Sequence, residues 1–221
     1  MVQDSQVHSM SYFRADSPSP RPPPSRERGP VAAVILAAGE SKRMGEPKQL
    51  LPVSGQSMVT RVTEVVCAAD LAQVVVVIGA HAQAVAQAVA GLPVEMVRND
   101  RWPEGMTSSL HAGLHALRSE IKATLVVLAD QPWLTAELIR AIVDCYHTTG
   151  APVVAPFYQG QRGRPVLFDR SLFPELLAAR DDESRREIIA RHRDQIARVE
   201  VEDPALFRDI DTRQDYQEIG Q

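Results

Sequence analysis

Three cations near the front of the chain, Lys42, Arg43 and Lys48, lie within a span of seven positions. They follow three small residues at 37–39, Ala-Ala-Gly. Before these, the apolar and partly β-branched run at 31–36 predicts a strand that is buried on both faces. Small residues after a buried strand let a ligand approach the backbone N–H groups closely, and cations offset negative charge. This order of residues predicts a phosphate-binding turn.

The turn matches neither of two common phosphate-binding motifs. Gly39 and Gly45 are separated by five residues, and Glu46-Pro47 precedes Lys48 where a Walker A motif requires glycine. The pattern Gly-x-Gly-x-x-Gly is absent from the chain. Taken alone, these residues also fit a buried strand followed by an exposed basic loop, so both interpretations stay open at this point.

Acidic side chains that could hold a metal come from two later segments. Asp130 directly follows the apolar run Leu125–Ala129, which predicts a carboxylate at the end of a buried strand. Asp209 and Asp211 stand two positions apart, just before a helix that Thr212 is expected to cap. Residues two apart in an extended segment point the same way, so both carboxylates could face one site. Mg²⁺ prefers oxygen ligands of this kind. The alternative for Asp130 is an ordinary turn residue.

Two further loops carry groups suited to a phosphorylated ligand. Gly105, Ser108 and Ser109 stand at the start of a helical pattern, where hydroxyls and a helix N-terminus offer hydrogen bonds to a ribose, a base or a phosphate. The segment 160–168 places two glycines and two arginines before a strand, and arginine forks suit phosphates and planar rings. Helix capping and a solvated hairpin loop are the respective alternatives.

The chain alternates strand and helix patterns, which predicts an α/β fold with helices on both faces of a parallel sheet. Strands are expected at 31–36, 73–79, 94–97, 125–129, 153–155, 166–168 and 199–201, and helices at 59–68, 82–90, 109–117, 135–148, 183–192 and from Thr212. Ligands of such sheets bind beyond the carboxyl ends of the strands. The turn after residue 36, Gly79, the Gly105 loop and Asp130 all fall there, so they can form one site.

Composition and charge narrow the function classes. The 221 residues are 44% hydrophobic, carry a net charge of −4 and have a pI of about 5.9, which argues against a general nucleic-acid or membrane-surface binder. Neither a secretory signal pattern nor an apolar run of about 20 residues is visible. Two distant cysteines, Cys67 and Cys145, fit buried positions in a cytoplasmic protein. Residues 1–30 are rich in Pro, Ser and Arg and are expected to be a disordered tail before a domain at 31–221.

The segment 36–52, LAAGESKRMGEPKQLLP, resembles the signature L-A-A-G-x-S-x-R-M-G-x-x-K-x-L-L-P of the MobA/MocA-like nucleotidyltransferases, and within them the molybdenum cofactor cytidylyltransferases. The segments at 105–114, 129–132, 160–168 and 209–216 are similar to further motifs of that family. The resemblance implies a three-layer α/β/α, Rossmann-like nucleotidyltransferase fold with a mostly parallel sheet.

It also implies a Mg²⁺-dependent enzyme that transfers CMP from CTP to molybdopterin and releases pyrophosphate, with a recipient molybdoenzyme or its chaperone as a further partner. Arg43, Lys48 and Asp130 would be catalytic, and Asp130, Asp209 and Asp211 would hold Mg²⁺. The nucleotide would contact Leu36, Ala37, Ala38, Gly39, Arg43, Lys48, Gly79, Gly105, Ser108 and Ser109, and the acceptor would contact Gln161, Arg162, Gly163, Arg164 and Pro165.

Departures from the family pattern leave alternatives open. The segment 179–189 lacks the glycines of the family's G-D-x-G-A-R loop, and Arg164 stands where relatives commonly have Asn or His. Ala38, where guanylyl-transferring relatives usually have glycine, favours cytosine by narrowing the base pocket. Guanylyl transfer, transfer to a sugar or alditol phosphate, and non-catalytic delivery of the cofactor are the alternatives. Every catalytic version requires Lys48 and Asp130 to face the same site.

Overall fold

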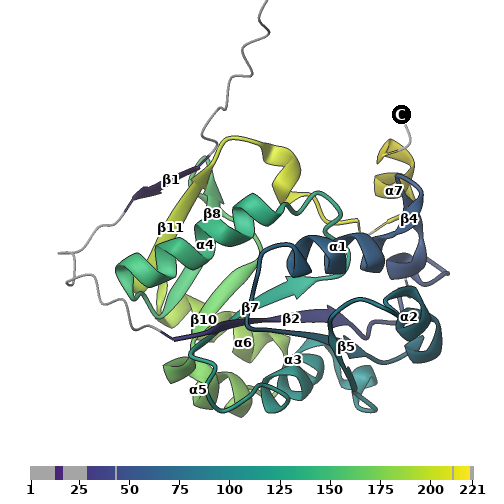
Figure 1. The fold of residues 1–221 in the computed structure, drawn as a ribbon, viewed down its shortest axis with the longest axis horizontal. Helices are drawn as coiled ribbons and strands as arrows, with labels where there is room; N and C mark the ends of the chain where they lie inside the picture. The colour runs from purple at the N-terminus through teal and green to yellow at the C-terminus, as the bar shows by residue number, and fades with distance from the viewer. Residues whose placement is uncertain (1–12, 17–28, 43, 211, 220–221) are drawn as a thin grey trace, which may run out of the picture.

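The computed structural model describes residues 13–16, 29–42, 44–210 and 212–219. Its centre is a nine-stranded sheet in the order β1-β11-β8-β10-β7-β2-β5-β6, with β9 paired to β8 (Figure 1). The strands are β1 (Phe13–Asp16), β2 (Val31–Ala37), β5 (Gln73–Ile78), β6 (Glu95–Arg98), β7 (Ala123–Leu128), β8 (Val153–Tyr158), β9 (Gln161–Arg162), β10 (Val166–Asp169) and β11 (Ile196–Val201). A separate small hairpin joins β3 (Pro52–Val53) to β4 (Gln56–Ser57).

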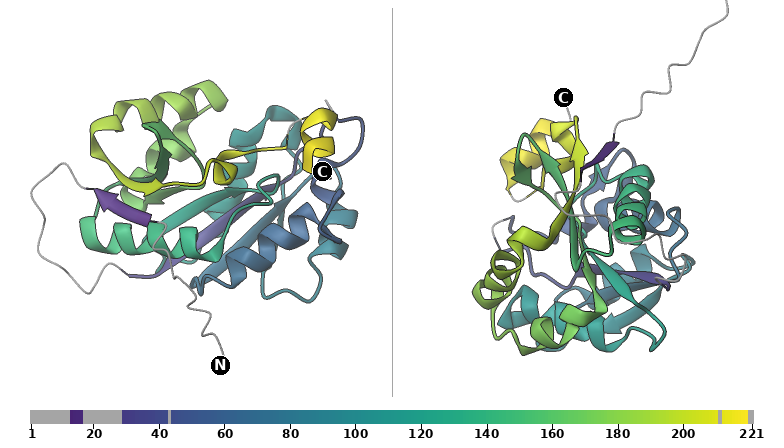
Figure 2. Two further views of the ribbon diagram at one scale, coloured as in Figure 1. Left: turned by 90° about the horizontal axis from the view of Figure 1, so that it is seen from above. Right: turned by 90° about the vertical axis from the view of Figure 1, so that its left-hand side faces the viewer.

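Helices cover both faces of the sheet, as the left panel of Figure 2 shows. The helices are α1 (Met58–Cys67), α2 (Ala82–Ala88), α3 (Met106–His115), α4 (Ala136–Thr149), α5 (Phe173–Ala178), α6 (Asp182–Arg191) and α7 (Arg213–Ile219). Strand β2 explains the layering: Ala33 and Ile35 pack into one core cluster with α1, α2 and α4, whereas Val34 and Leu36 pack into another with α3, α5 and α6. Alternate residues of a strand point to opposite faces, so a wholly apolar strand supports two layers of helices.

The register of the central strands brings their carboxyl ends to one level. Strand β2 runs parallel to β5 and β7, with Ala37 opposite Ile78 and Leu36 opposite Leu128. The segments that follow these three strands therefore meet at one edge of the sheet, which confirms the predicted three-layer fold with a mostly parallel sheet. Strand β10 is the exception at the centre of the sheet, because it pairs antiparallel with both β7 and β8.

The predicted helix ends are confirmed where capping chemistry is strong. Thr135 caps α4 by accepting a hydrogen bond from Leu138 N at 3.2 Å, and Gly150 ends that helix in the left-handed conformation at φ 64°. Before α7, Thr212 and Asp215 form the expected reciprocal pair of bonds at 2.7 and 3.2 Å. Helix α3 begins at Met106, three residues before the predicted start.

Some elements differ from the expectation. Helix α5 was not predicted from the sequence, and α6 begins at Asp182, so helix occupies the segment that lacks the family's glycines. Within the predicted tail, β1 pairs antiparallel with β11, while residues 1–12 and 17–28 lie outside the described part of the chain. The division into a tail at 1–30 and a domain at 31–221 stays a prediction.

Burial raises the pKa of the Cys145 thiol. The pKa of the half-buried Cys67 thiol is raised as well, first by burial and second by the nearby Glu64 carboxylate. Both thiols therefore stay protonated at neutral pH. In the part of the chain that the structure describes, none of the helices is both long and apolar enough to span a bilayer.

Candidate active site

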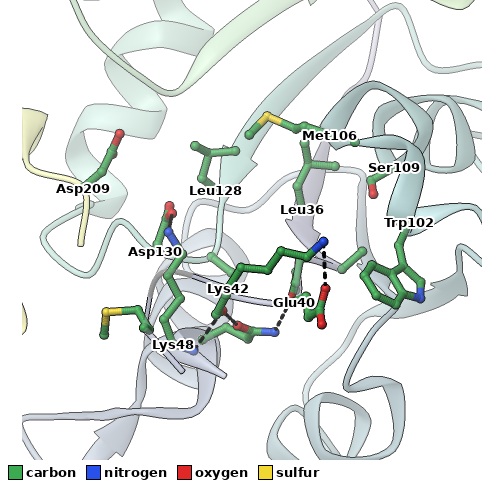
Figure 3. A pocket seen from close by; sticks show the side chains of 18 of the residues that line it. Leu36, Glu40, Lys42, Lys48, Trp102, Met106, Ser109, Leu128, Asp130 and Asp209 are labelled. Atoms are coloured by element: carbon green, nitrogen blue, oxygen red, sulfur yellow. Dashed lines mark hydrogen bonds and ion pairs between the residues drawn. The ribbon is translucent and has the colours of Figure 1, made fainter. Parts of the chain in front are cut away.

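A cavity of about 480 Å³ opens at the carboxyl edge of the sheet (Figure 3). The segment after β2 and the loop before α3 line it, and Asp130 and Asp209 lie on the side away from Trp102 and Ser109 in Figure 3. Arg164 also lines the cavity. The lining residues are Leu36, Ala37, Ala38, Gly39, Glu40, Ser41, Lys42, Met44, Lys48, Gln49, Trp102, Pro103, Gly105, Met106, Ser109, Leu128, Ala129, Asp130, Arg164, Arg186 and Asp209.

Lys48 and Asp130 form a close and largely buried charged contact in the cavity. The Nζ of Lys48 lies 2.5 Å from Oδ2 of Asp130 and also donates to the carbonyl oxygen of Ile210 at 3.1 Å. The two side chains are only 20% and 13% exposed, so the pair is shielded from solvent and from salt more than a surface pair would be. The predicted cationic turn and the predicted strand-end carboxylate therefore meet, although they are 82 positions apart.

A small apolar cluster holds the C-terminal segment against this pair. Met44, Val53, Met58 and Ile210 are all buried together, and Ile210 is 0% exposed. The backbone N–H of Ile210 donates to the carbonyl oxygen of Asp130 at 3.2 Å. Burial of Ile210 thus places its neighbour Asp209 at the cavity, where Asp209 and Asp130 lie on the same side in Figure 3.

Arg164 brings a second cation to a second carboxylate. Its Nη1 donates to Oδ2 of Asp209 at 2.5 Å, with side-chain exposures of 47% for Arg164 and 24% for Asp209. Arg164 belongs to the loop between β9 and β10 and precedes a cis peptide bond to Pro165. Arg164 lines the cavity, but Gln161, Arg162, Gly163 and Pro165, the other predicted acceptor residues, are not among the lining residues.

The turn after β2 is held in shape by two side chains. Gln49 is 4% exposed and donates from Nε2 to the carbonyl oxygen of Gly39 at 3.0 Å. The hydroxyl of Ser41, at φ 62°, donates to Oε1 of Gln49 at 2.9 Å and accepts from the backbone N–H of Lys48 at 3.0 Å. These bonds fold the turn back on the start of the next element, so that Gly39 and Lys48 face one cavity.

Gly79 supports the turn from beneath. A Cβ at this position would lie 2.7 Å from Cβ of Ala38 and 2.9 Å from Cβ of Trp102, both too close for carbon atoms. Gly79 is not among the lining residues, so the structure places this predicted nucleotide contact behind the cavity and Ala38 in front of it.

The start of α3 forms the opposite wall. Gly105, at φ 109°, and Ser109 line the cavity, whereas the hydroxyl of Ser108 donates to backbone carbonyls of Arg101 and Gly105 and does not line it. Gly105 has no side chain to cap the helix. Asp182, at the start of α6, caps it instead, because its Oδ1 accepts from Thr107 N at 2.9 Å and from the Thr107 hydroxyl at 2.7 Å.

The structure thus brings most of the predicted site residues together and adds others. Arg43 and Asp211 lie outside the described residues. Sequence reasoning missed the turn-holding role of Gln49, the ring of Trp102, the cap from Asp182 and the cavity position of Arg186. Gln49 stands inside the LAAG…KQLLP segment and could have been suspected there, but no local signal connects Asp182 to a helix that begins 76 positions earlier.

One observation tests whether the acidic residues fit a divalent cation. Oδ1 of Asp130 is buried and has no hydrogen-bond partner among the described residues. A buried carboxylate oxygen without a donor is costly unless a cation satisfies it, so Asp130 fits a metal ligand. Within 13–16, 29–42, 44–210 and 212–219, no group of three His, Cys, Asp or Glu side chains is placed to hold a metal by itself. This donor set fits an ion that also takes ligands from a bound phosphate.

Comparison with known proteins agrees with this geometry. The family model described as "MobA-like NTP transferase domain" matches residues 33–196. Nicotine blue oxidoreductase of Paenarthrobacter nicotinovorans is 31% identical over 194 residues, which span 82% of this chain and 92% of that protein. The crystal structure of Rv0371c from Mycobacterium tuberculosis H37Rv superposes with a TM-score of 0.78 at 27% identity, covering 87% of this chain and 98% of the other. A complex of Rv0371c with manganese has a TM-score of 0.73 at 26% identity and covers 86% and 97% of the two chains.

Proposed function

Because the chain belongs to the MobA-like NTP transferase domain family and is a nucleotidyltransferase, we propose that it transfers CMP from CTP to molybdopterin and releases pyrophosphate. The observation that supports this most directly is the meeting of Lys48 with Asp130 at the mouth of the phosphate-binding turn. A protein that only bound a nucleotide would not require a shielded pair of Lys48 and Asp130 in which the second carboxylate oxygen of Asp130 is buried without a donor among the described residues.

In the proposed reaction an oxygen of the acceptor's terminal phosphate attacks the α-phosphorus of CTP. The new bond joins that oxygen to phosphorus, the bond from phosphorus to the bridging oxygen breaks, and pyrophosphate leaves with the electron pair. Both substrates are anionic, so the enzyme must position them and offset their charge. The backbone at 37–39 and the side chain of Lys48 serve this purpose for the triphosphate, and Arg43, outside the described residues, is proposed to join them.

Asp130 and Asp209 are the proposed metal ligands, with Asp211 as a further candidate outside the described residues. A bound Mg²⁺ or Mn²⁺ would supply positive charge beside the reacting phosphates. Lys48 holds Asp130 in place at the sheet edge, since its second bond to Ile210 ties the lysine to the C-terminal segment. Removal of one such electrostatic group typically lowers kcat by about 100- to 1000-fold.

The proposed base preference rests on Ala38. The Cβ atoms of Ala38 and Trp102 both lie close to Gly79, and both residues line the cavity. In Figure 3 Trp102 lies at the end of the cavity away from Asp130. A smaller pocket favours a pyrimidine, and the indole of Trp102 offers a flat face for stacking. We therefore favour CTP over GTP, and guanylyl transfer to the same acceptor is the alternative.

Arg164 and Arg186, which both line the cavity, are the proposed contacts of the acceptor. Guanidinium groups suit both the phosphate and the planar ring system of molybdopterin. A molybdoenzyme or its chaperone would receive the product. A sugar or alditol phosphate is the alternative acceptor, because α6 replaces the family's glycine-containing loop here.

Nicotine blue oxidoreductase, the 31% identical relative, raises a second candidate, a redox reaction of nicotine blue. The identity of 31% over 82% of the chain is the observation in its favour. Hydride transfer does not require Lys48 or a pair of aspartates at a metal, so these residues favour nucleotidyl transfer.

Pyrophosphate release with Mg²⁺, each of four nucleoside triphosphates and each candidate acceptor separates these functions. We expect release that depends on both CTP and molybdopterin. Greater release with GTP would assign guanylyl transfer, and release only with a sugar phosphate would replace the acceptor. Binding of the cofactor without turnover would support a delivery role, and redox turnover of nicotine blue would support the redox candidate.

A further inference from the structure

Both carboxylates proposed for the metal are already paired with a cation, and the two pairs differ in character. Lys48 is 20% exposed and donates to Asp130 and to the carbonyl oxygen of Ile210. Arg164 is 47% exposed and donates to Asp209 from the end of a surface loop. We therefore expect Lys48 to stay bonded to Asp130, whereas separating Arg164 from Asp209 should cost little free energy.

We propose that Arg164 is a displaceable counterion of Asp209, which competes with the divalent cation and then binds the phosphate of the acceptor. This inference rests on the proposed function, because it assumes that Asp209 is a metal ligand. It assigns to Arg164 two successive partners: Asp209 before the metal arrives, and the acceptor phosphate afterwards.

The physical argument begins with charge. A guanidinium group stays protonated over the whole practical pH range, so Arg164 always carries the charge that a metal would have to replace at Asp209. A half-exposed ion pair of this kind contributes about 0–1 kcal/mol, which a divalent ion at a carboxylate can exceed. Removal of Arg164 should therefore tighten metal binding.

The second part of the argument concerns the donors of the arginine. Guanidinium carries five N–H donors in a planar fork, and the recorded bond to Asp209 uses Nη1. Arg164 lines the same cavity as Lys48 and Arg186, so its released fork remains at the proposed site. Two parallel N–H groups match two oxygens of a phosphate. An asparagine at position 164, as in relatives that the sequence resembles, has one neutral amide and cannot offer two parallel charged N–H donors to a phosphate.

Mn²⁺ binding in the presence of a non-hydrolysable CTP analogue, and without acceptor, provides a readout that does not depend on turnover. Electron paramagnetic resonance of free Mn²⁺ would be measured for the full chain, Arg164→Asn, Asp130→Asn and two controls. Arg162→Asn alters an arginine of strand β9, two positions away and not among the lining residues, and Arg186→Asn removes another arginine that lines the cavity.

We expect Arg164→Asn to bind Mn²⁺ roughly threefold to tenfold more tightly than the wild type, with both controls changed by less than about twofold. At saturating Mg²⁺, the same substitution should raise the KM for the acceptor by about tenfold and leave the KM for CTP unchanged. An Mn²⁺ affinity of Arg164→Asn equal to or below that of the wild type would overturn the competition, and an unchanged acceptor KM would overturn the phosphate role.

The failure of this inference can be distinguished from failure of the proposed function. If the wild type binds Mn²⁺ and Asp130→Asn does not, the metal site stands, and the Arg164→Asn result alone decides the inference. If the wild type and Asp130→Asn bind Mn²⁺ equally, or neither they nor Arg164→Asn bind it, the proposed metal site and the inference both fall.

Discussion

Lys48 Nζ lies 2.5 Å from Oδ2 of Asp130, across 82 positions of sequence. The contact joins the turn after β2 to the end of β7, two neighbouring strands of the sheet. It also explains why the C-terminal segment belongs to the site, since the same amine donates to the carbonyl of Ile210. One side chain therefore ties together three segments that are far apart in the chain.

The first prediction concerns this lysine. Lys48→Met should lower kcat/KM for nucleotidyl transfer by roughly 100- to 1000-fold, because it removes a positive charge from a shielded site. Pyrophosphate release measures the effect. Lys42→Met is the matched control, because Lys42 lines the same cavity but its side chain is 80% exposed, and its loss should cost less than about tenfold.

The same substitution has a stability component that can be separated from catalysis. Lys48→Met leaves Asp130 without its cation, which should lower the free energy of unfolding by about 1–3 kcal/mol in urea. The double variant Lys48→Met/Asp130→Asn should regain most of this stability and remain inactive. Recovery of activity in the double variant would show that Lys48 acts only as a structural partner.

Two glycines of the site predict opposite defects. Gly79→Ala places a methyl group 2.7 Å from Ala38 and should cost about 1–3 kcal/mol of stability. Gly39→Ala meets no atom within 4 Å, and Gly39 is exposed at the cavity, so the fold should be unaffected while the KM for CTP rises. Thermal unfolding and steady-state kinetics measure the two effects, and equal stability losses would contradict the assigned positions.

Gln49 is predicted to hold the turn. Gln49→Leu keeps a similar volume but removes the bonds to Gly39 and Ser41, which should lower stability by about 1–2 kcal/mol and raise the KM for CTP. Urea unfolding and CTP titration of turnover measure the two effects. Loss of stability with an unchanged KM would mean that the turn does not contact the nucleotide.

The cap from Asp182 is predicted to matter for the wall of the cavity at α3. Asp182→Ala removes the acceptor of both Thr107 bonds and should cost about 0.5–2 kcal/mol, whereas Asp182→Asn keeps an acceptor oxygen and should cost less. Because Gly105 and Ser109 stand on this wall, the alanine variant should also bind CTP more weakly. Equal behaviour of the two variants in thermal unfolding would contradict the capping role.

Much of the fold could be predicted because local chemistry and long-range order agree. The buried runs of β2, β5 and β7 have one apolar pattern on both faces, and parallel strands with shared register put residues 38, 79 and 130 at one edge. The caps at Thr135 and Thr212 are local hydrogen-bond patterns, so sequence spacing alone located them.

What could not be predicted depends on contacts between distant segments. The pairing of Arg164 with Asp209 and the cap that Asp182 supplies to α3 join residues 45 and 75 positions apart, and neither has a local signature. Helix α5 is six residues long, too short for a clear helical period. Strand β10 lies between β7 and β8 and runs antiparallel to both. The apolar pattern of a strand specifies neither its neighbours nor its direction.

The most direct test of the central claim is the mass of the acceptor after incubation with CTP, Mg²⁺ and either the wild type or Asp130→Asn. The account predicts that molybdopterin gains one cytidylyl group with the wild type and none with Asp130→Asn. The free energies of unfolding of the two proteins should differ by less than about 2 kcal/mol. An equal gain with Asp130→Asn, or no gain with the wild type on any nucleotide and acceptor, would contradict it.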